Sequence, residues 1–173
     1  MKKISLLILF IITLHANAQI ASTGYKIYSW GSNKNTIPVL AKCSQTNAGD
    51  QFSNCEINNK DSIFYAGFHY SYCNFRFYKE ALVEVHFDLR FNELGGVVAK
   101  LSTDFGAPKI LENATTRADT LSTTIGYEWI VGDTRVLIIN KGIASPVWCI
   151  LSSQSHKKAY RKKVIDIEKI IFN

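Results

Sequence analysis

Three polar side chains at every second position of one segment could carry out chemistry. Glu84, His86 and Asp88 alternate with apolar residues, so on a β-strand all three point to the same face. Carboxylates and imidazoles bind metal ions and transfer protons in proteins. Successive side chains on one strand face lie about 7 Å apart, which is too far for one ion to bind all three on a straight strand. The alternative is a polar outer face that pairs with Arg76 across a hairpin.

The chain also contains four cysteines, at positions 43, 55, 73 and 149. Their spacing contains no Cys-x-x-Cys redox motif and no two close pairs of zinc ligands. The polar residues between Cys43 and Cys55 do not keep the ligand spacing of a calcium loop. The N-terminus has the features of an export signal, which are described below. In an exported chain, an even number of cysteines predicts disulfides. Four cysteines allow three pairings; the local pair is Cys43–Cys55, which leaves Cys73–Cys149.

A basic cluster near the C-terminus is a candidate docking surface. Five of the seven residues from 157 to 163 are basic: Lys157, Lys158, Arg161, Lys162 and Lys163. Such a cluster could bind an acidic partner or an anionic lipid surface. The alternative is the solvent-exposed face of a helix whose apolar stripe packs on the sheet. That stripe consists of Tyr160, Val164, Ile167 and Ile171.

The motifs of common catalytic and nucleotide-binding sites are absent. There is no Gly-x-Ser-x-Gly, and Gly95-Gly96 lacks both the phosphate-loop lysine and the dinucleotide fingerprint. We therefore interpret these two glycines as helix packing or a close backbone approach. The sequence predicts no cofactor and no enzyme, and the alternative is a catalytic or small-ligand site that forms only in three dimensions.

Hydrophobic periodicity predicts the elements that position these residues. Alternation indicates strands over 73–77 and 81–89, joined at Lys79-Glu80, with Val83, Val85 and Phe87 facing inward beside Cys73. Apolar residues at helical spacing predict a helix from Phe91 to Phe105, which ends before Gly106.

The remaining segments complete an antiparallel arrangement. A second hairpin is predicted over 125–131 and 135–140, then a strand over 145–151 and a basic helix at about 155–171. A strand is also expected over 25–30, followed by a short helix reaching Ala41. Residues 43–62 and 112–122 are polar and are expected to form loops. The predicted fold class is α+β: an antiparallel sheet built from hairpins, with helices packed on one face and disulfides as staples.

The N-terminus has the three parts of a secretory signal peptide. Two lysines precede an apolar stretch from Ile4 to Leu14, and Ala16 and Ala18 fit the cleavage pattern. Cleavage after Ala18 predicts one domain over residues 19–173, with 173 − 18 = 155 residues. Removing Lys2 and Lys3 leaves 20 − 2 = 18 basic and 14 acidic residues, a net charge of +4. That excess is too small to indicate nucleic-acid binding.

From Phe75 onward, the chain resembles small exported α+β proteins of Gram-negative bacteria that are mostly uncharacterised. The resemblance rests on Leu-x-x-x-Phe-Gly-x-Pro at the end of the helix (Leu101 to Pro108), on Tyr127-x-Trp129 in a strand and on the lysine-rich C-terminal helix. It implies the fold and no activity.

Together these features predict a non-enzymatic protein of the periplasm or the secreted fraction. It would act by contact with another envelope or secreted protein, as inhibitors, immunity proteins and assembly accessories do. Stable insertion into a membrane is not expected, because no later stretch approaches the roughly 20 apolar residues that a spanning helix needs. A third possibility is a peripheral membrane protein that uses the basic C-terminal helix.

Overall fold

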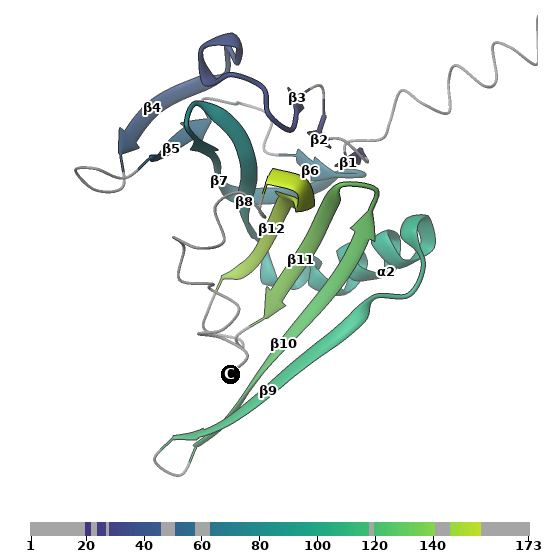
Figure 1. Ribbon diagram of the computed structural model, residues 1–173. Helices are drawn as coiled ribbons and strands as arrows, with labels where there is room; N and C mark the ends of the chain where they lie inside the picture. The colour runs from purple at the N-terminus through teal and green to yellow at the C-terminus, as the bar shows by residue number, and fades with distance from the viewer. Residues whose placement is uncertain are drawn as a thin grey trace, which may run out of the picture.

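Two four-stranded meanders, joined edge to edge, make up the main sheet of the computed structural model (Figure 1). The first meander contains β4 (Leu40–Gln45), β5 (Phe52–Ile57), β7 (Phe68–Tyr78) and β8 (Ala81–Leu89). The second contains β9 (Lys109–Arg117), β10 (Thr120–Val131), β11 (Thr134–Asn140) and β12 (Val147–Ser153). The strand order is β4-β5-β7-β8-β12-β11-β10-β9, and the short β6 (Ile63–Tyr65) pairs with β7. All pairings are antiparallel, and the meanders meet where β12 lies beside β8.

The structure describes residues 20–21, 24–26, 28–45, 51–57, 63–117, 120–140 and 146–156.

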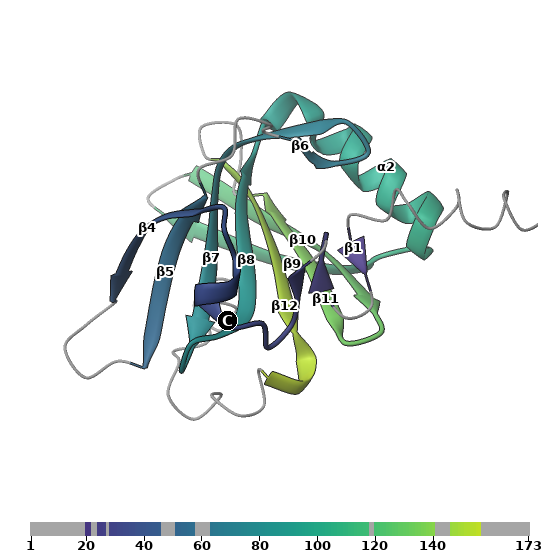
Figure 2. The ribbon, with the colours of Figure 1, turned by 90° about the horizontal axis from the view of Figure 1, so that it is seen from above.

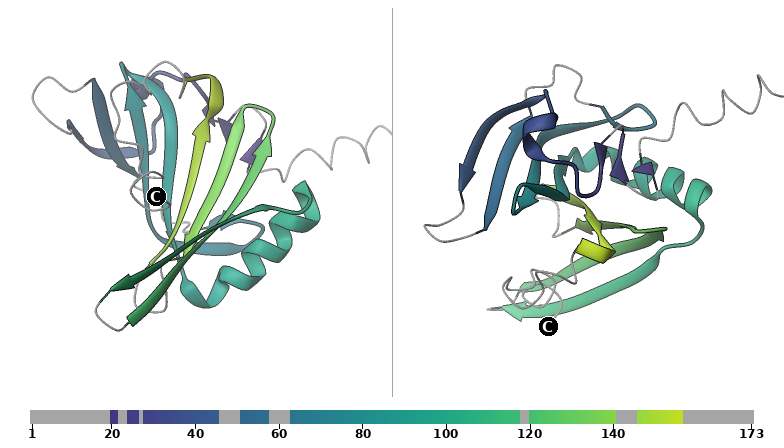
Figure 3. Two further views of the ribbon diagram at one scale, coloured as in Figure 1. Left: turned by 60° about the horizontal axis from the view of Figure 1, so that its bottom comes forward. Right: turned by 45° about the horizontal axis from the view of Figure 1, so that its top comes forward.

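Smaller elements cover one side of this sheet. Helix α2 (Leu94–Phe105) follows a single 3-10 turn, η2 (Phe91–Glu93), and a second such turn is η1 (Lys34–Thr36). A small sheet contains β1 (Ile20–Ala21), β2 (Gly24–Tyr25) and β3 (Tyr28–Ser29). The main sheet is bent, and α2, β6 and the small sheet lie on its concave side (Figures 2 and 3). The predicted α+β class, built from hairpins, is therefore correct.

The main core lies on the concave side and runs across both meanders. One row of directly opposed, fully buried residues crosses six strands: Cys55, Phe75, Val85, Leu151, Val136 and Trp129. Trp129 ends this row with its side chain buried, and its indole Nε1 donates to the Gly106 carbonyl at 2.9 Å. This bond ties β10 to the residue that ends α2, where the backbone adopts φ 87°.

A β-bulge changes the orientation of part of β8. Arg76 lies opposite Glu84, but Phe77 lies opposite Leu82, so one extra residue is present on β8. As a result Leu82 joins the main core, whereas Val83 packs on the other face with Phe52. The prediction that Val83 faces inward with Val85 and Phe87 is wrong for this reason.

Several predicted loops are strands. Residues 43–62 include part of β4 and all of β5, residues 112–117 belong to β9, and residues 120–122 begin β10. The short helix expected before Ala41 is only the 3-10 turn η1, after which β4 begins. The predicted β7–β8 hairpin with its Lys79-Glu80 turn, α2, the β10–β11 hairpin and β12 are all present, with shifts of a few residues at their ends.

The cysteines form one disulfide and two free thiols. Cys43 lies opposite Cys55 on neighbouring strands, with their Cα atoms 4.1 Å apart, and the two are bonded. Cys73 and Cys149 are buried free thiols, so the predicted Cys73–Cys149 bond is absent. Both lie opposite Phe87, one on β7 and the other on β12. Two strand spacings place their Cα atoms about 10 Å apart, beyond the roughly 7 Å limit for a disulfide.

Some predicted features fall on residues that the structure does not describe. The signal peptide, residues 1–18, is one of these features. The basic cluster Lys157, Lys158, Arg161, Lys162 and Lys163 also lies outside the described residues, as does nearly all of the helix predicted at 155–171. Among the described residues, no helix has the length and apolar character needed to cross a lipid bilayer.

The arrangement of the cysteines predicts the outcome of a thiol titration. Without reductant, the native protein should expose no reactive thiol, because Cys73 and Cys149 are buried and burial raises the pKa of both thiols. After denaturation two thiols per chain should react with Ellman's reagent. If no thiol reacts, Cys73 and Cys149 form a disulfide. That result would contradict the strand order in which β8 lies between β7 and β12.

The two glycines of α2 should respond differently to a methyl group. A Cβ on Gly95 meets nothing within 4 Å, whereas one on Gly96 lies 2.8 Å from the Phe68 ring. Gly95→Ala should therefore raise the free energy of unfolding by about 1 kcal/mol, the usual helix-propensity gain. Gly96→Ala should lose that gain because Phe68 must move. Equal gains in chemical denaturation would contradict the close packing of Phe68 on α2.

Candidate functional site

The polar strip of β8 lies on the convex face of the sheet, opposite the main core. Glu84, His86 and Asp88 are all partly buried there, and their neighbours alternate with them into the core. On β7 the opposing residues are Arg76, Asn74 and Tyr72; on β12 they are Ser152, Ile150 and Trp148. The strip therefore lies between a polar strand and a largely apolar one.

The three side chains of the strip interact separately and do not converge on one point. Arg76 Nη1 lies 3.7 Å from Glu84 Oε1, which is the pairing predicted across the hairpin. His86 Nε2 lies 3.8 Å from Asp88 Oδ1. Within the described residues, no three His, Cys, Asp or Glu side chains are close enough together to bind a metal ion. The geometry favours the interpretation as a polar face.

His86 is the perturbed titratable group of this strip. Its side chain is 24% exposed, and its ring contacts the Trp148 ring edge-on, with the centroids 5.6 Å apart. Burial lowers the pKa of His86, while Glu84 and Asp88 act in the opposite direction without reversing the shift. Its Nε2 is buried and has no hydrogen-bond partner among the described residues. The imidazole is thus held in its neutral form.

A second cluster contains the three residue types of a hydrolase triad, which the sequence analysis did not bring together. Ser153 Oγ donates to Asp133 Oδ2 at 2.6 Å, and His156 Nδ1 lies 2.9 Å from the same Oγ. In a catalytic triad the histidine lies between the acid and the serine. Here the serine occupies the middle and is fully buried. This order does not provide an activated nucleophile.

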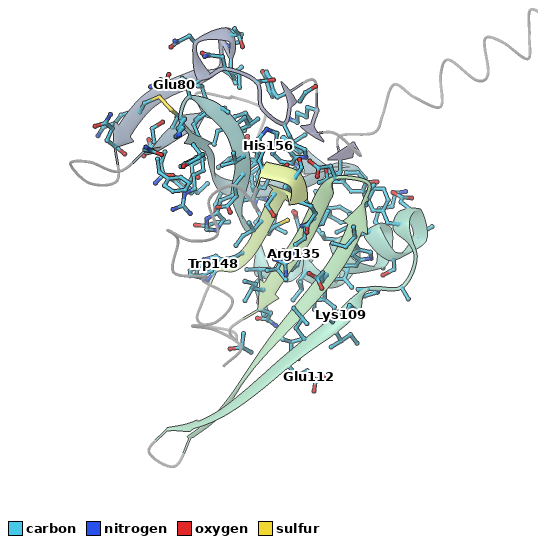
Figure 4. The ribbon with its side chains drawn as sticks, in the orientation of Figure 1. Glu80, Lys109, Glu112, Arg135, Trp148 and His156 are labelled. Atoms are coloured by element: carbon cyan, nitrogen blue, oxygen red, sulfur yellow. A yellow bond between two sulfur atoms is a disulfide. The ribbon has the colours of Figure 1, made fainter. Side chains whose placement is uncertain are left out.

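The same cluster caps the helical turn that begins after β12. Ser153 Oγ accepts a hydrogen bond from the backbone N–H of His156 at 3.1 Å, and Asp133 Oδ1 accepts one from that of Ser155 at 2.7 Å. Burial acts to raise the pKa of Asp133, but the hydrogen bonds from Ser153 and Ser155 outweigh it and the pKa is lowered. Ser153 therefore acts as the N-cap of this turn, and His156 lies at this end of β12 (Figure 4).

A third polar group links β6 to α2 on the concave side. The Tyr65 hydroxyl donates to Asp104 Oδ2, and Lys100 Nζ lies 2.5 Å from the other oxygen of Asp104. Burial raises the pKa of Tyr65, and the Asp104 carboxylate raises it further. The phenol therefore stays protonated and acts as a structural donor.

Among the side chains that the structure describes, the most exposed large apolar ones lie on the β9–β10 hairpin. Ile110 is 57% exposed and Ile130 is 58% exposed. Tyr127 packs on the main core and so faces the concave side. Ile110 lies opposite Tyr127 and shares this side. Ile130 is three residues after Tyr127 on the same strand, so its side chain points to the convex side. Lys109, whose side chain is 71% exposed, precedes Ile110 on β9. Figure 4 shows Lys109 and Glu112 along this margin of the sheet.

No protein-family model matches this chain, and no curated protein or solved structure matches it significantly.

The lowered pKa of His86 makes a prediction about stability and pH. Because the folded pKa lies below the unfolded value of 6.5, the unfolded chain binds more protons as the medium is acidified. Above pH 6.5, His86 does not reduce the free energy of unfolding. As the pH falls below 6.5, protonation of His86 in the unfolded chain lowers that free energy. His86→Gln should therefore flatten the fall in unfolding free energy between pH 7 and 5. Parallel curves for the variant and the original protein would contradict the burial of His86.

Proposed function

We propose that this protein is exported and acts in the bacterial envelope or the secreted fraction by binding another protein, without catalysis. The export signal in residues 1–18 supports the compartment. The observation that carries the contact function is the outer edge of the main sheet at β9. Because β9 ends the strand order, the side of this strand away from β10 has no partner strand among the described residues.

An open edge of this length is unusual in a soluble protein. A row of free backbone N–H and C=O groups is a template for pairing with another chain, and proteins commonly shorten, bend or cover such edges. β9 extends over nine residues and carries the exposed Ile110. With β10 it forms a long two-stranded arm that reaches beyond the neighbouring strands (Figure 1). The edge is suited to contact with a partner.

The opposite edge of the sheet is protected in four ways. β4 is shorter, with six residues, and its register with β5 is interrupted by a bulge between Leu40 and Cys43. The disulfide fixes Cys43 to β5, and Pro38 stands just before the strand. The two ends of one sheet therefore differ, and β9 is the better candidate for binding.

The polar clusters of the described residues support a non-enzymatic role. Glu84 pairs with Arg76, Tyr65 donates to Asp104, and Ser153 caps a helical turn together with Asp133. Each of these groups has a structural partner. The exposed Ser155 Oγ lies 3.4 Å from His156 Nδ1, but it donates to Asp133 Oδ2 at 2.9 Å, so the carboxylate and not the imidazole holds its proton.

A pair of matched variants tests this function. Ile110→Asp and Ile130→Asp introduce the same charge on the same hairpin at sites of equal exposure, so both proteins should fold with unchanged thermal unfolding. Each variant and the original protein carry a photo-crosslinking residue in place of Glu112 and an affinity tag, and are expressed in the bacterium that encodes them.

We expect a specific crosslinked envelope or secreted protein with the original chain and with Ile130→Asp, and its loss with Ile110→Asp. The proposal fails if no protein is crosslinked, or if Ile110→Asp and Ile130→Asp give the same products. If Ile110→Asp alters thermal unfolding, Ile110→Ser replaces it, since serine removes the apolar contact without a charge.

A further inference from the structure

We propose that β9 binds an extended segment of its partner as an added β-strand, and that this segment alternates apolar with acidic residues. This inference rests on the proposed function and specifies how the contact is made. Strand addition at a free edge is a common mode of peptide recognition, in which backbone hydrogen bonds provide affinity and the alternate side chains provide specificity. In β9 the backbone would provide the affinity, and the side chains on its concave and convex sides would provide the specificity.

The backbone of β9 is held in place for such pairing. Nine residues pair in unbroken register with β10, from Lys109 opposite Glu128 to Arg117 opposite Thr120. In an antiparallel pair only alternate residues direct their N–H and C=O toward the partner strand, so about half of the nine residues direct theirs outward. Leu111 packs against the convex-side cluster of Leu137, Ile139 and Ile150, which fixes the strand from beneath. A fixed edge reduces the ordering cost of binding.

On the concave side, β9 offers an apolar contact. Ile110 lies opposite Tyr127, which itself packs on the main core beside Trp129. Its exposed side chain is therefore the outer end of a continuous apolar row, and a strand added along β9 would place its own side chain directly beside it. An apolar side chain at that position would bury the exposed part of Ile110.

On the convex side, β9 offers a positive charge. Lys109 Nζ lies 3.8 Å from Glu128 Oε2, and Glu128 Oε1 already accepts a hydrogen bond from Arg135 Nε. One carboxylate thus neutralises two cations, and the largely exposed Lys109 retains charge and donors for a second carboxylate. Since Lys109 and Ile110 are neighbours on opposite faces, the matching segment carries an acidic residue next to an apolar one.

Charge also favours a different protein over a second copy of this chain. Without the predicted signal peptide the chain has 18 basic and 14 acidic residues, a net charge of +4, so two copies repel each other at long range. An acidic segment is attracted by the same field. We therefore assign the edge to an acidic extended segment of a partner, and self-association is a result that would overturn the assignment.

Synthetic peptides test the side-chain pattern. The probe is an eight-residue peptide that alternates valine with glutamate and carries a fluorescent label, and the comparison peptide has lysine in place of glutamate. By fluorescence anisotropy at low salt, we expect the glutamate peptide to bind at least about tenfold more tightly. Lys109→Glu should reverse this preference. Lys42→Glu, at an exposed site on the β4 edge, is the matched control and should leave the preference intact.

N-methylated peptides test the backbone pairing. In a strand, the N–H groups of alternate residues point to opposite edges, so N-methylation of the valines blocks one edge of the glutamate peptide and N-methylation of the glutamates blocks the other. Strand addition predicts that one of these two peptides keeps its affinity and the other loses at least about tenfold. Equal effects of the two modifications would show that the peptide does not bind as a strand.

The remaining outcomes separate this inference from the proposed function. Failure of the glutamate peptide to bind, equal binding of both peptides, or an unchanged preference in Lys109→Glu overturns the strand-addition mode. So does a dimer in sedimentation that Ile110→Asp disrupts, because the occupant is then a second copy. A crosslinked partner lost with Ile110→Asp still supports the proposed function in any of these cases. Absence of any such partner overturns the function, whatever the peptides show.

Discussion

The pairing of β8 with β12 is the interaction on which the rest of the structure depends. Six pairs of residues, from Leu89 opposite Val147 to Glu84 opposite Ser152, join the two meanders into one sheet. The chain leaves the first meander at the end of β8, crosses through α2 and returns at the opposite margin with β9. Only after three further strands does β12 reach β8. The core row that passes from Val85 to Leu151 is continuous because of this pairing, so neither meander buries its concave face without the other.

The same pairing determines what the polar and reactive groups can do. It places Phe87 between Cys73 and Cys149 and so keeps the two thiols apart. It also brings Trp148 against His86 and closes one side of the polar strip. Because β12 takes the position beside β8, the first strand of the second meander is left at the margin. The β9 edge, which has no outer partner strand in the described part of the chain, and the central junction are therefore two results of one topology.

The parts of the fold that could be predicted from the sequence are those with a strong periodic pattern. The β7–β8 and β10–β11 hairpins and α2 alternate or repeat regularly, because one face of each is buried. β4 and β9 were missed because most of their residues are polar, as in Ala41–Gln45, and β5 was missed because its apolar residues Phe52, Cys55 and Ile57 do not keep a period of two. The face of Val83 could not be predicted, because a bulge is set by the partner strand. The Cys73–Cys149 pairing failed since strand order, which the sequence does not display, decides which cysteines are neighbours.

Of the candidate site, the Arg76–Glu84 pair followed from a local pattern, whereas the β9 edge required the complete strand order. The burial of both faces of β11 and β12 has a further consequence. The residues from Val136 to Ile139 are all fully buried, so a shift of β11 by one residue would exchange one apolar side chain for another. Hydrophobicity alone thus does not specify alignment at the centre of the sheet. Alignment is specified instead by polar contacts at one end: Trp30 Nε1 donates to Thr134 Oγ1 at 2.8 Å, Arg135 binds Glu128, and Ser153 binds Asp133. Loss of these contacts would yield a mixture of strand alignments with similar cores, so their main contribution is to the uniqueness of the folded state.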